Sequence, residues 1–248
     1  MRRWMTGWLL CGFWMGVFLG SAAGQVDEAA WSVTATLNAS SHYVWRGLRL
    51  SRGLVFQPEV CVAHGDWSAT LWGNVDAREE RWNETDILLT RAFEWERLTM
   101  EIGYIYYHML DADDTHEVSA GLWLDMPLAP GVQFYYDFAA GDGGYVEASV
   151  NPVLVLGEGV ELELRGALGF NLHNRVMAEF EDGSSYAGVY SGDVLAAAHL
   201  SLTDHCTLVP YLGYSLALGD KAVAVFRDYS QEGRLQTPYG GIRLEWAF

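Results

Sequence analysis

Apolar and polar residues alternate with a period of two from Trp31 to Phe248, and this pattern constrains the fold more than any other feature. In residues 118–126, 132–138 and 160–170, apolar side chains take one parity, and mostly polar or small side chains take the other. A period of two is that of a β-strand, whose successive side chains point to opposite faces. A soluble β-sandwich also alternates. Charged residues within these long segments favour instead a barrel with a wet interior and a lipid-facing apolar surface.

About twelve alternating segments follow one another, each near the ~10 residues that a tilted membrane strand requires. They cover residues 31–44, 54–63, 67–76, 85–94, 98–108, 117–126, 132–140, 145–155, 160–173, 188–202, 207–219 and 235–248. The connections after every second segment are short, and the others are mostly longer and polar, as at 77–85, 109–116, 174–187 and 219–234. Short periplasmic turns, longer external loops and an even strand count are typical of outer-membrane barrels. The sequence therefore predicts an all-β fold, a single antiparallel transmembrane β-barrel of about twelve strands.

The first residues have the pattern of an export signal. Arg2 and Arg3 precede an almost uncharged apolar stretch, and the small residues 21–24 follow it. Cleavage after Ala23 or Gly24 fits equally well. We expect a cleaved signal peptide over 1–24, a short periplasmic segment over 25–30, the barrel over 31–248, and a location in the cell outer membrane.

The charge balance is strongly acidic. The whole chain has a net charge of −17, and without the two signal arginines 13 basic residues face 32 acidic ones, a net charge of −19. Nucleic-acid binding needs clustered positive charge for phosphate contacts, so the composition excludes that class of partner. The expected partners are outer-membrane lipid and lipopolysaccharide, the outer-membrane assembly machinery, and small solutes.

The last segment carries a specific signal. Its apolar face ends on an aromatic residue at the C-terminus and consists of Ile242, Leu244, Trp246 and Phe248. An alternating strand of this kind resembles the recognition strand that the assembly machinery reads. An ordinary edge strand would instead leave an exposed edge, which closure in a membrane removes.

Three short stretches carry a family resemblance: residues 41–47 (SHYVWRG), 72–76 (WGNVD) and 103–107 (GYIYY). With them, the chain resembles the TorF-type porins, outer-membrane proteins whose function is poorly defined. The likeness covers residues 31–140 best and the rest only as a barrel pattern. It implies a barrel and a porin label rather than a substrate. The chain departs from the family at His42, where a small polar residue is usual.

The parity that faces the barrel interior collects acids. Its candidate pore-lining residues are Glu101, Glu117, Asp125, Asp137, Glu147, Glu161, Glu163, Arg165, Asp193, Arg243 and Glu245. These residues could form a lumen that attracts cations, because low-dielectric walls focus the field of a one-sign surface. Alternatively, the carboxylates hydrogen-bond to tyrosines and arginines and seal a narrow interior.

The first long connection holds a basic cluster, Arg46, Arg49 and Arg52. It could contact lipopolysaccharide phosphates or an anionic solute, or it could pair with acids of neighbouring loops, which is the simpler interpretation. A second loop group, Asp111, Asp113, Asp114 and Glu117, has the residues but not the spacing of a calcium loop. Arg91 falls on the apolar parity of its segment. Either a bulge shifts the register there or Arg91 snorkels at the lipid boundary.

We therefore expect a porin-like channel for passive diffusion of small solutes, with a preference for cations. No cofactor, metal site or catalytic residue is expected. Two alternatives stay open: a barrel enzyme of the lipase or deacylase type that acts on lipid, and a sealed structural or adhesive barrel. Ser40 with His42 and His199 with Ser201 share faces, but two-residue spacing on a strand places side chains about 7 Å apart, beyond hydrogen-bond reach.

Overall fold

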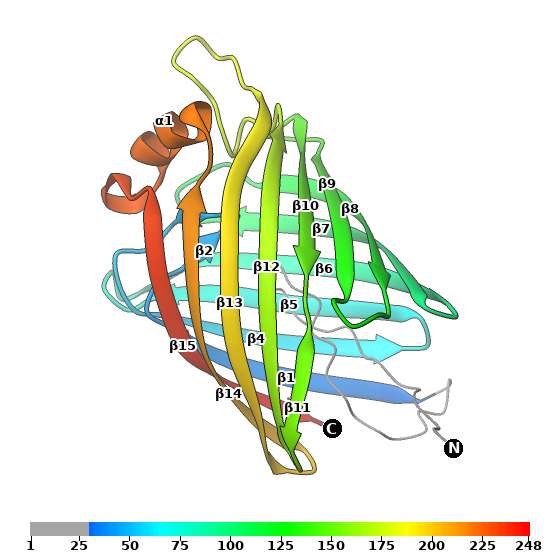
Figure 1. Ribbon diagram of the computed structural model, residues 1–248. Helices are drawn as coiled ribbons and strands as arrows, with labels where there is room; N and C mark the ends of the chain where they lie inside the picture. The colour runs from blue at the N-terminus through cyan, green and yellow to red at the C-terminus, as the bar shows by residue number, and fades with distance from the viewer. Residues whose placement is uncertain (1–29) are drawn as a thin grey trace.

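A computed structural model describes residues 30–248 of the chain. The predicted signal peptide and all but the last residue of the predicted segment 25–30 lie outside this range. The described chain forms one closed antiparallel β-barrel of twelve strand positions, as predicted (Figure 1). Its wall strands are β1 (Trp31–Ser40), β4 (Val55–His64), β5 (Trp67–Asp76), β6 (Arg81–Trp95), β7 (Leu98–Met109), β8 (Thr115–Leu124), β9 (Pro130–Asp137), β10 (Gly143–Val150), β11 (Val153–Gly157), β12 (Val160–Leu172), β13 (Ala187–Thr203), β14 (Cys206–Ala217) and β15 (Gln236–Ala247).

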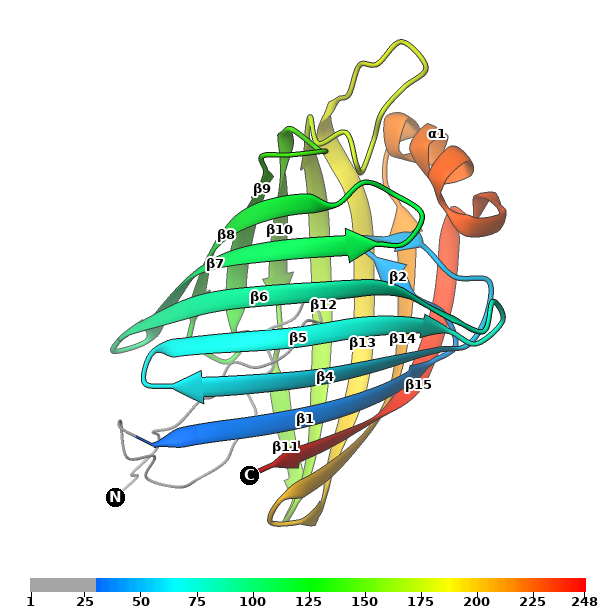
Figure 2. The same ribbon diagram turned by 180° about the vertical axis from the view of Figure 1, so that it is seen from behind.

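Apart from β10 and β11, each wall strand pairs with the wall strands before and after it, and the first and last strands close the ring. β1 pairs with β15 from Thr34–Ala247 to Ser40–Gly241, and the two lie side by side in both views (Figure 2). The Phe248 N–H also donates to the Val33 carbonyl at 2.9 Å. No open edge therefore remains on this side of the sheet, which satisfies the backbone groups that lipid cannot.

One wall position is shared by two strands, β10 and β11, which both pair with β12. Asn151 and Pro152 interrupt them. Proline lacks an N–H and cannot donate to a ladder, so the break falls where the sequence removes a donor. The predicted segment 145–155 therefore appears as two shorter strands.

The outer surface of the wall is apolar. Leu71, Ile87, Ile102, Leu168 and Leu212 are among the outward side chains that are 43–73% exposed. Because exposed apolar side chains this numerous need an apolar solvent, the wall faces lipid. Aromatic side chains mark both borders of this band. Trp31, Trp67 and Trp95 lie at the end with the short turns, and Trp82, Tyr136 and Phe138 lie at the loop end.

The position of Arg91 is settled by the register. β6 pairs with β7 without a shift from Glu84 to Trp95, so no bulge lies at Arg91. Its guanidinium lies 4.7 Å from the Phe93 ring centroid, 5.2 Å from that of Trp67 and 3.8 Å from Asp66 Oδ2 in the nearest turn. Arg91 thus points outward at the turn-end border, as a snorkelling side chain does.

The loop end contains elements that the alternation did not predict: β2 (Val44–Trp45), β3 (Leu48–Arg49), α1 (Asp220–Tyr229) and the 3-10 turn η1 (Gln231–Gly233). The helix buries Ala222, Val225 and Phe226, whose spacing places them on one face. Asp220 in the first turn interacts favourably with the helix dipole and so stabilises the helix. No helix within residues 30–248 is long and apolar enough to cross a membrane.

Candidate functional site

The first long connection, residues 41–54, folds into the barrel rather than outward. β2 and β3 form a tight hairpin whose two turn residues, Arg46 and Gly47, have φ of 47° and 92°. Positive φ at both central positions is the requirement of a type I′ turn. The Leu50 N–H donates to the Tyr43 carbonyl at 2.8 Å, and Tyr43 N–H donates to Ser51 Oγ at 2.8 Å, which holds the base of the hairpin. We call residues 41–54 the inner loop.

At the tip of the inner loop, Arg46 forms a buried bidentate ion pair with Glu117 of β8. Arg46 Nη1 donates to Oε1 at 2.8 Å, and Nη2 donates to Oε2 at 2.7 Å. The Tyr107 hydroxyl also donates to Oε2 at 2.8 Å. Burial by itself lowers the pKa of Arg46, but the charge and hydrogen bonds of Glu117, together with Tyr107 and Tyr135, raise it by more. The pKa is therefore above its usual value and the guanidinium stays charged.

Three aromatic rings surround the same guanidinium. The Arg46 Cζ atom lies 4.6 Å from the ring centroid of Trp45, 4.4 Å from that of Tyr135 and 4.7 Å from that of Tyr145. Distances below about 6 Å give attractive cation–π contacts, which are stronger when water is excluded. We call Glu117, Tyr107, Tyr135 and Tyr145, which all belong to the barrel wall, the wall cradle.

The inner loop also joins three buried apolar clusters and so spans the lumen. Leu48 lies in the largest cluster, Tyr43 lies in a second with Val55 and Trp72, and Val44 packs against a third. The largest cluster continues toward the loop end through Met177 and through Phe226 of α1. The loop end of the barrel is therefore packed with side chains.

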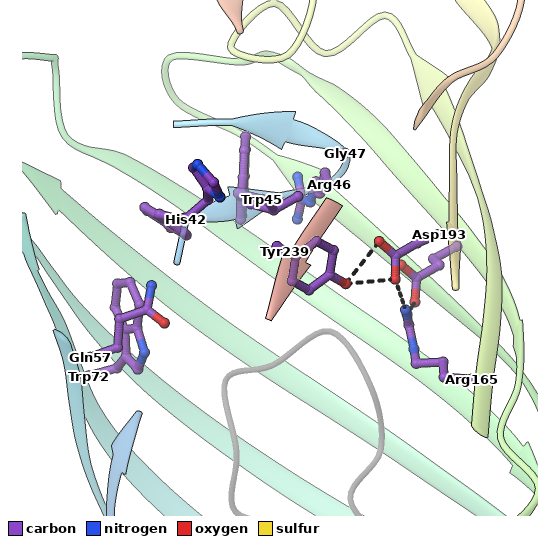
Figure 3. A pocket seen from close by; sticks show the side chains of 12 residues that line it. His42, Trp45, Arg46, Gly47, Gln57, Trp72, Arg165, Asp193 and Tyr239 are labelled. Carbon is purple, nitrogen blue, oxygen red and sulfur yellow. Dashed lines mark hydrogen bonds and ion pairs between the residues drawn. The ribbon is translucent and has the colours of Figure 1, made fainter. Parts of the chain in front are cut away.

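A cavity lies against the inner loop on the lumen side (Figure 3). It has about 610 Å³ of space between atoms, part of which is continuous with solvent. Arg165 of β12 lies on one side of it, where its guanidinium contacts Glu147 and lies 3.3 Å from Asp193 Oδ1. The Tyr239 hydroxyl donates to Asp193 at 3.1 Å. Trp72 lies on the other side, so the cavity offers both charged and aromatic surfaces.

The wall opposite Arg165 carries a ladder of neutral amides. Asn38 Nδ2 donates to Gln57 Oε1 at 2.9 Å, Gln57 Nε2 donates to Asn74 Oδ1 at 3.1 Å, and Asn74 Nδ2 donates to Asn83 Oδ1 at 2.7 Å. The Tyr211 hydroxyl donates to Asn38 Oδ1 at 3.0 Å. These hydrogen bonds join the side chains of neighbouring strands without any charged group. Neutral amides carry no charge pattern that would distinguish them in the sequence, so the ladder was not predicted.

Two further carboxylates in the lumen were also missed, Glu84 and Asp86 of β6. Glu84 accepts a hydrogen bond from the Tyr43 hydroxyl at 3.2 Å. Asp86 is fully buried, and within residues 30–248 neither of its oxygens has a hydrogen-bond partner. The outward parity of Ile87 and Leu89 would have placed Asp86 inside.

Most of the predicted pore-lining residues lie on the inward face of the wall. Glu117, Asp137, Glu147, Glu163, Arg165 and Arg243 are buried, and Glu101, Glu161, Asp193 and Glu245 are partly buried. Many of them form ion pairs or short polar contacts: Glu163 lies 3.1 Å from His199 Nε2, and Arg243 Nε lies 2.6 Å from Glu245 Oε1. Asp137 accepts from Thr115 Oγ1 at 2.7 Å. Asp125 is the exception, because β8 ends at Leu124 and leaves it exposed in the turn.

The predicted external cluster of arginines is divided by the inner loop. Arg46 and Arg49 are only 4% and 8% exposed, so the prediction of a shared external surface is wrong for them. The hairpin carries Arg46 into the lumen, whereas Arg49 Nη1 lies 3.3 Å from Glu232 Oε2 of a neighbouring loop. Arg52 is exposed and its Nε donates to Gln231 Oε1 at 3.0 Å. Arg49 and Arg52 therefore both contact residues of a neighbouring loop.

The serines and histidines considered for catalysis make other contacts. Ser40 Oγ donates to the His42 carbonyl at 2.8 Å, and His199 contacts Glu163. Ser41 Oγ lies 3.1 Å from His42 Nδ1 but also accepts the Gly240 N–H at 3.1 Å, so it links the loop to β15. Within the described range, no group of three or more His, Cys, Asp or Glu side chains could hold a metal ion.

The acidic residues around 111–117 also separate. Asp114 accepts from the Tyr106 hydroxyl at 2.5 Å and lies 2.8 Å from His108 Nδ1, both near the outer rim. These hydrogen bonds lower the pKa of Asp114. Glu117 faces the lumen instead. The four acids considered for calcium therefore do not converge on one point.

The fold is similar to solved outer-membrane barrels. An outer-membrane channel from Pseudomonas putida F1 matches with a TM-score of 0.54 and 9% identity, over 91% of this chain and 99% of that chain. The translocator domain of the autotransporter NalP from Neisseria meningitidis matches with a TM-score of 0.51 and 12% identity, over 90% of each chain. At such low identities the likeness defines the class of protein, an outer-membrane β-barrel, and nothing finer.

Sequence comparisons give no family. No protein-family model matches the chain, and no curated protein matches it. The resemblance of residues 41–47, 72–76 and 103–107 to TorF-type porins therefore stays a prediction.

Proposed function

We propose that this protein is an outer-membrane channel through which small solutes, cations in preference, diffuse passively, and that the inner loop sets its narrowest point. The observation that carries the proposal is the contrast between an apolar outer wall and a lumen rich in carboxylates. The inward-facing acids Glu101, Glu147, Glu163, Asp193 and Glu245 outnumber the inward-facing bases Arg165 and Arg243, so acidic groups are in excess along the lumen. Fixed carboxylates in a water-filled, low-dielectric passage concentrate cations and deplete anions.

The glycines of the inner loop provide a matched test. A Cβ at Gly47 would lie 2.6 Å from Ser191 Cβ and 2.9 Å from Phe226 Cζ, and its φ of 92° also disfavours a side chain. A Cβ at Gly53 would meet nothing within 4 Å. Gly47→Val should expel the hairpin and raise single-channel conductance several-fold in a planar bilayer. Gly53→Val, in the same loop, should leave the conductance at the level of the unchanged protein.

Selectivity is tested in the same bilayers by the reversal potential under a salt gradient. We expect a cation preference at low salt, because the screening length falls from about 30 Å at 0.01 M to about 3 Å at 1 M. Replacing Glu161 and Glu163 by Gln should remove part of this preference. An anion preference would contradict the lumen assignment.

A sealed barrel is the second candidate, because Leu48, Met177 and Phe226 pack the loop end. No conductance from the unchanged protein together with conductance from Gly47→Val would make the inner loop a plug. No conductance from either would favour a sealed structural barrel over a channel.

A further inference from the structure

Apart from Trp45, the aromatic residues and the carboxylate that surround the Arg46 guanidinium belong to the barrel wall. Glu117 of β8, Tyr107 of β7, Tyr135 of β9 and Tyr145 of β10 are held by the barrel itself. Their backbones pair in register, with Tyr107 opposite Thr115 and Tyr135 opposite Tyr145. Only Arg46 and Trp45 come from the loop. The wall part of the site would therefore persist if the hairpin left.

The residue that fills the cradle is poorly suited to its own backbone. Arg46 has a φ of 47°, a left-handed conformation that is unfavourable for an L-residue with a long side chain. Type I′ turns favour Asn, Asp or Gly at this position. A local backbone preference therefore does not explain why residue 46 is an arginine. The contacts of its guanidinium with Glu117 explain it.

We propose that the wall cradle is a binding site for guanidinium-bearing solutes, and that Arg46 occupies it as an internal stand-in while the inner loop is inserted. The inference rests on the proposed channel, since the solute must reach the lumen. A solute with a planar guanidinium or amidinium group displaces Arg46 from Glu117 and thereby releases the hairpin.

The geometry selects the chemical class. Two parallel N–H···O bonds to one carboxylate match a planar fork, and an alkylammonium ion presents no such fork. The rings of Tyr135 and Tyr145, both within 4.7 Å of the Arg46 Cζ atom, suit a flat, weakly hydrated cation. The cavity beside the inner loop is lined by Arg46 and, from the wall, by Glu147, Asp193 and Arg165, so it reaches the guanidinium that a solute would replace.

The test removes the Arg46 side chain from the wall cradle and supplies a guanidinium compound in solution. Arg46→Ala protein in detergent is titrated with methylguanidinium, and with methylammonium at equal ionic strength, while the temperature of heat modification on gels is followed. Methylguanidinium should raise that temperature and bind about tenfold more tightly than methylammonium, because only it forms the bidentate pair. Arg52→Ala, which alters the exposed arginine of the same loop, should show no such rise.

A double variant, Arg46→Ala with Glu117→Gln, isolates the carboxylate and should lose the response. Equal effects of the two cations, or a response that survives Glu117→Gln, would overturn the site. Should Arg46→Ala fail to fold, Arg46→Lys takes its place, since lysine keeps the charge but only one donor group. Binding is measured without a bilayer, so a positive titration with no conductance would keep the site and refute the channel.

Discussion

Arg46 and Arg165 are both buried in the lumen and both pair with carboxylates, yet they belong to different parts of the molecule. Arg165 and its partners Glu147 and Asp193 all lie on wall strands. Arg46 lies on a hairpin, and only its partner Glu117 lies on the wall. The first pair joins strands of the wall to one another, whereas the second joins a loop to the wall. The same chemistry therefore links wall strands in one region and holds the inner loop in the other.

The largest expected effect contrasts the two arginines directly. Arg165→Met leaves the buried Glu147 and the partly buried Asp193 without their cation, and breaking a buried pair in this way costs about 3–5 kcal/mol. Arg46→Met should cost less, because the hairpin can withdraw and let water reach Glu117. The free energy of unfolding in urea and detergent micelles measures both. Equal losses would show that the inner loop is as fixed as the wall.

The next effect concerns Glu117, the acid that pairs with Arg46 of the inner loop. Glu117→Gln removes the charge that Arg46 contacts, and hydrogen bonds to charged groups contribute about 1.5–3 kcal/mol. The hairpin should become more accessible, which limited proteolysis at Arg49 and Arg52 measures. Glu101→Gln is the matched control, since Glu101 faces the lumen from β7 without an ion pair within the described residues. Increased cleavage in the control would mean that general loss of lumen charge releases the loop.

The smallest effect is a pH dependence of loop insertion through His42. Burial lowers the pKa of His42, Arg49 and Arg234 lower it further, and Glu232 acts in the opposite direction. The inserted loop therefore binds fewer protons at His42 than the released loop does. Insertion should be fully favoured above the ordinary histidine pKa of about 6.5 and weaken as the pH falls below it.

Conductance at pH 8 and pH 5 measures this change, with His42→Gln as the comparison. Protonation of lumen carboxylates affects both proteins alike, so the difference between them isolates His42. An identical response of the two proteins would exclude His42 as its source.

The wall was predictable from the sequence, because a side-chain period of two reports directly on which face each residue takes. The predicted segments 67–76 and 160–173 agree with β5 and β12 to within one residue. The first segment was too long, because alternation continues to Val44 whereas β1 ends at Ser40 and the chain then turns inward. Periodicity describes local conformation and carries no information on where a loop goes.

The interior arrangement was predicted less well, for reasons that differ from residue to residue. Arg46 and Arg49 were placed outside because charged loops are usually solvated, and the Arg46–Gly47 turn lacks the Asn-Gly or Asp-Gly signal of a hairpin. Helix α1 did have a signal, since Ala222, Val225 and Phe226 follow a helical spacing. Partners such as Glu117 for Arg46, 71 residues away, depend on barrel closure and cannot be read from local patterns.

The pairing of β1 with β15 bears on how fast the barrel can form. All other wall contacts join strands that follow one another in the chain, so most of the wall can grow by hairpin steps of low contact order. Thr34 and Ala247 meet only when almost the whole described chain has been drawn into a ring. The entropy of loop closure grows only slowly with length, by about 0.6 kcal/mol for each doubling, so this one distant contact adds little to the equilibrium cost. The pairing of β1 with β15 matters for the kinetics of folding. Until the two strands pair, their edges stay exposed, so the rate of this step decides how long the unfinished barrel can aggregate.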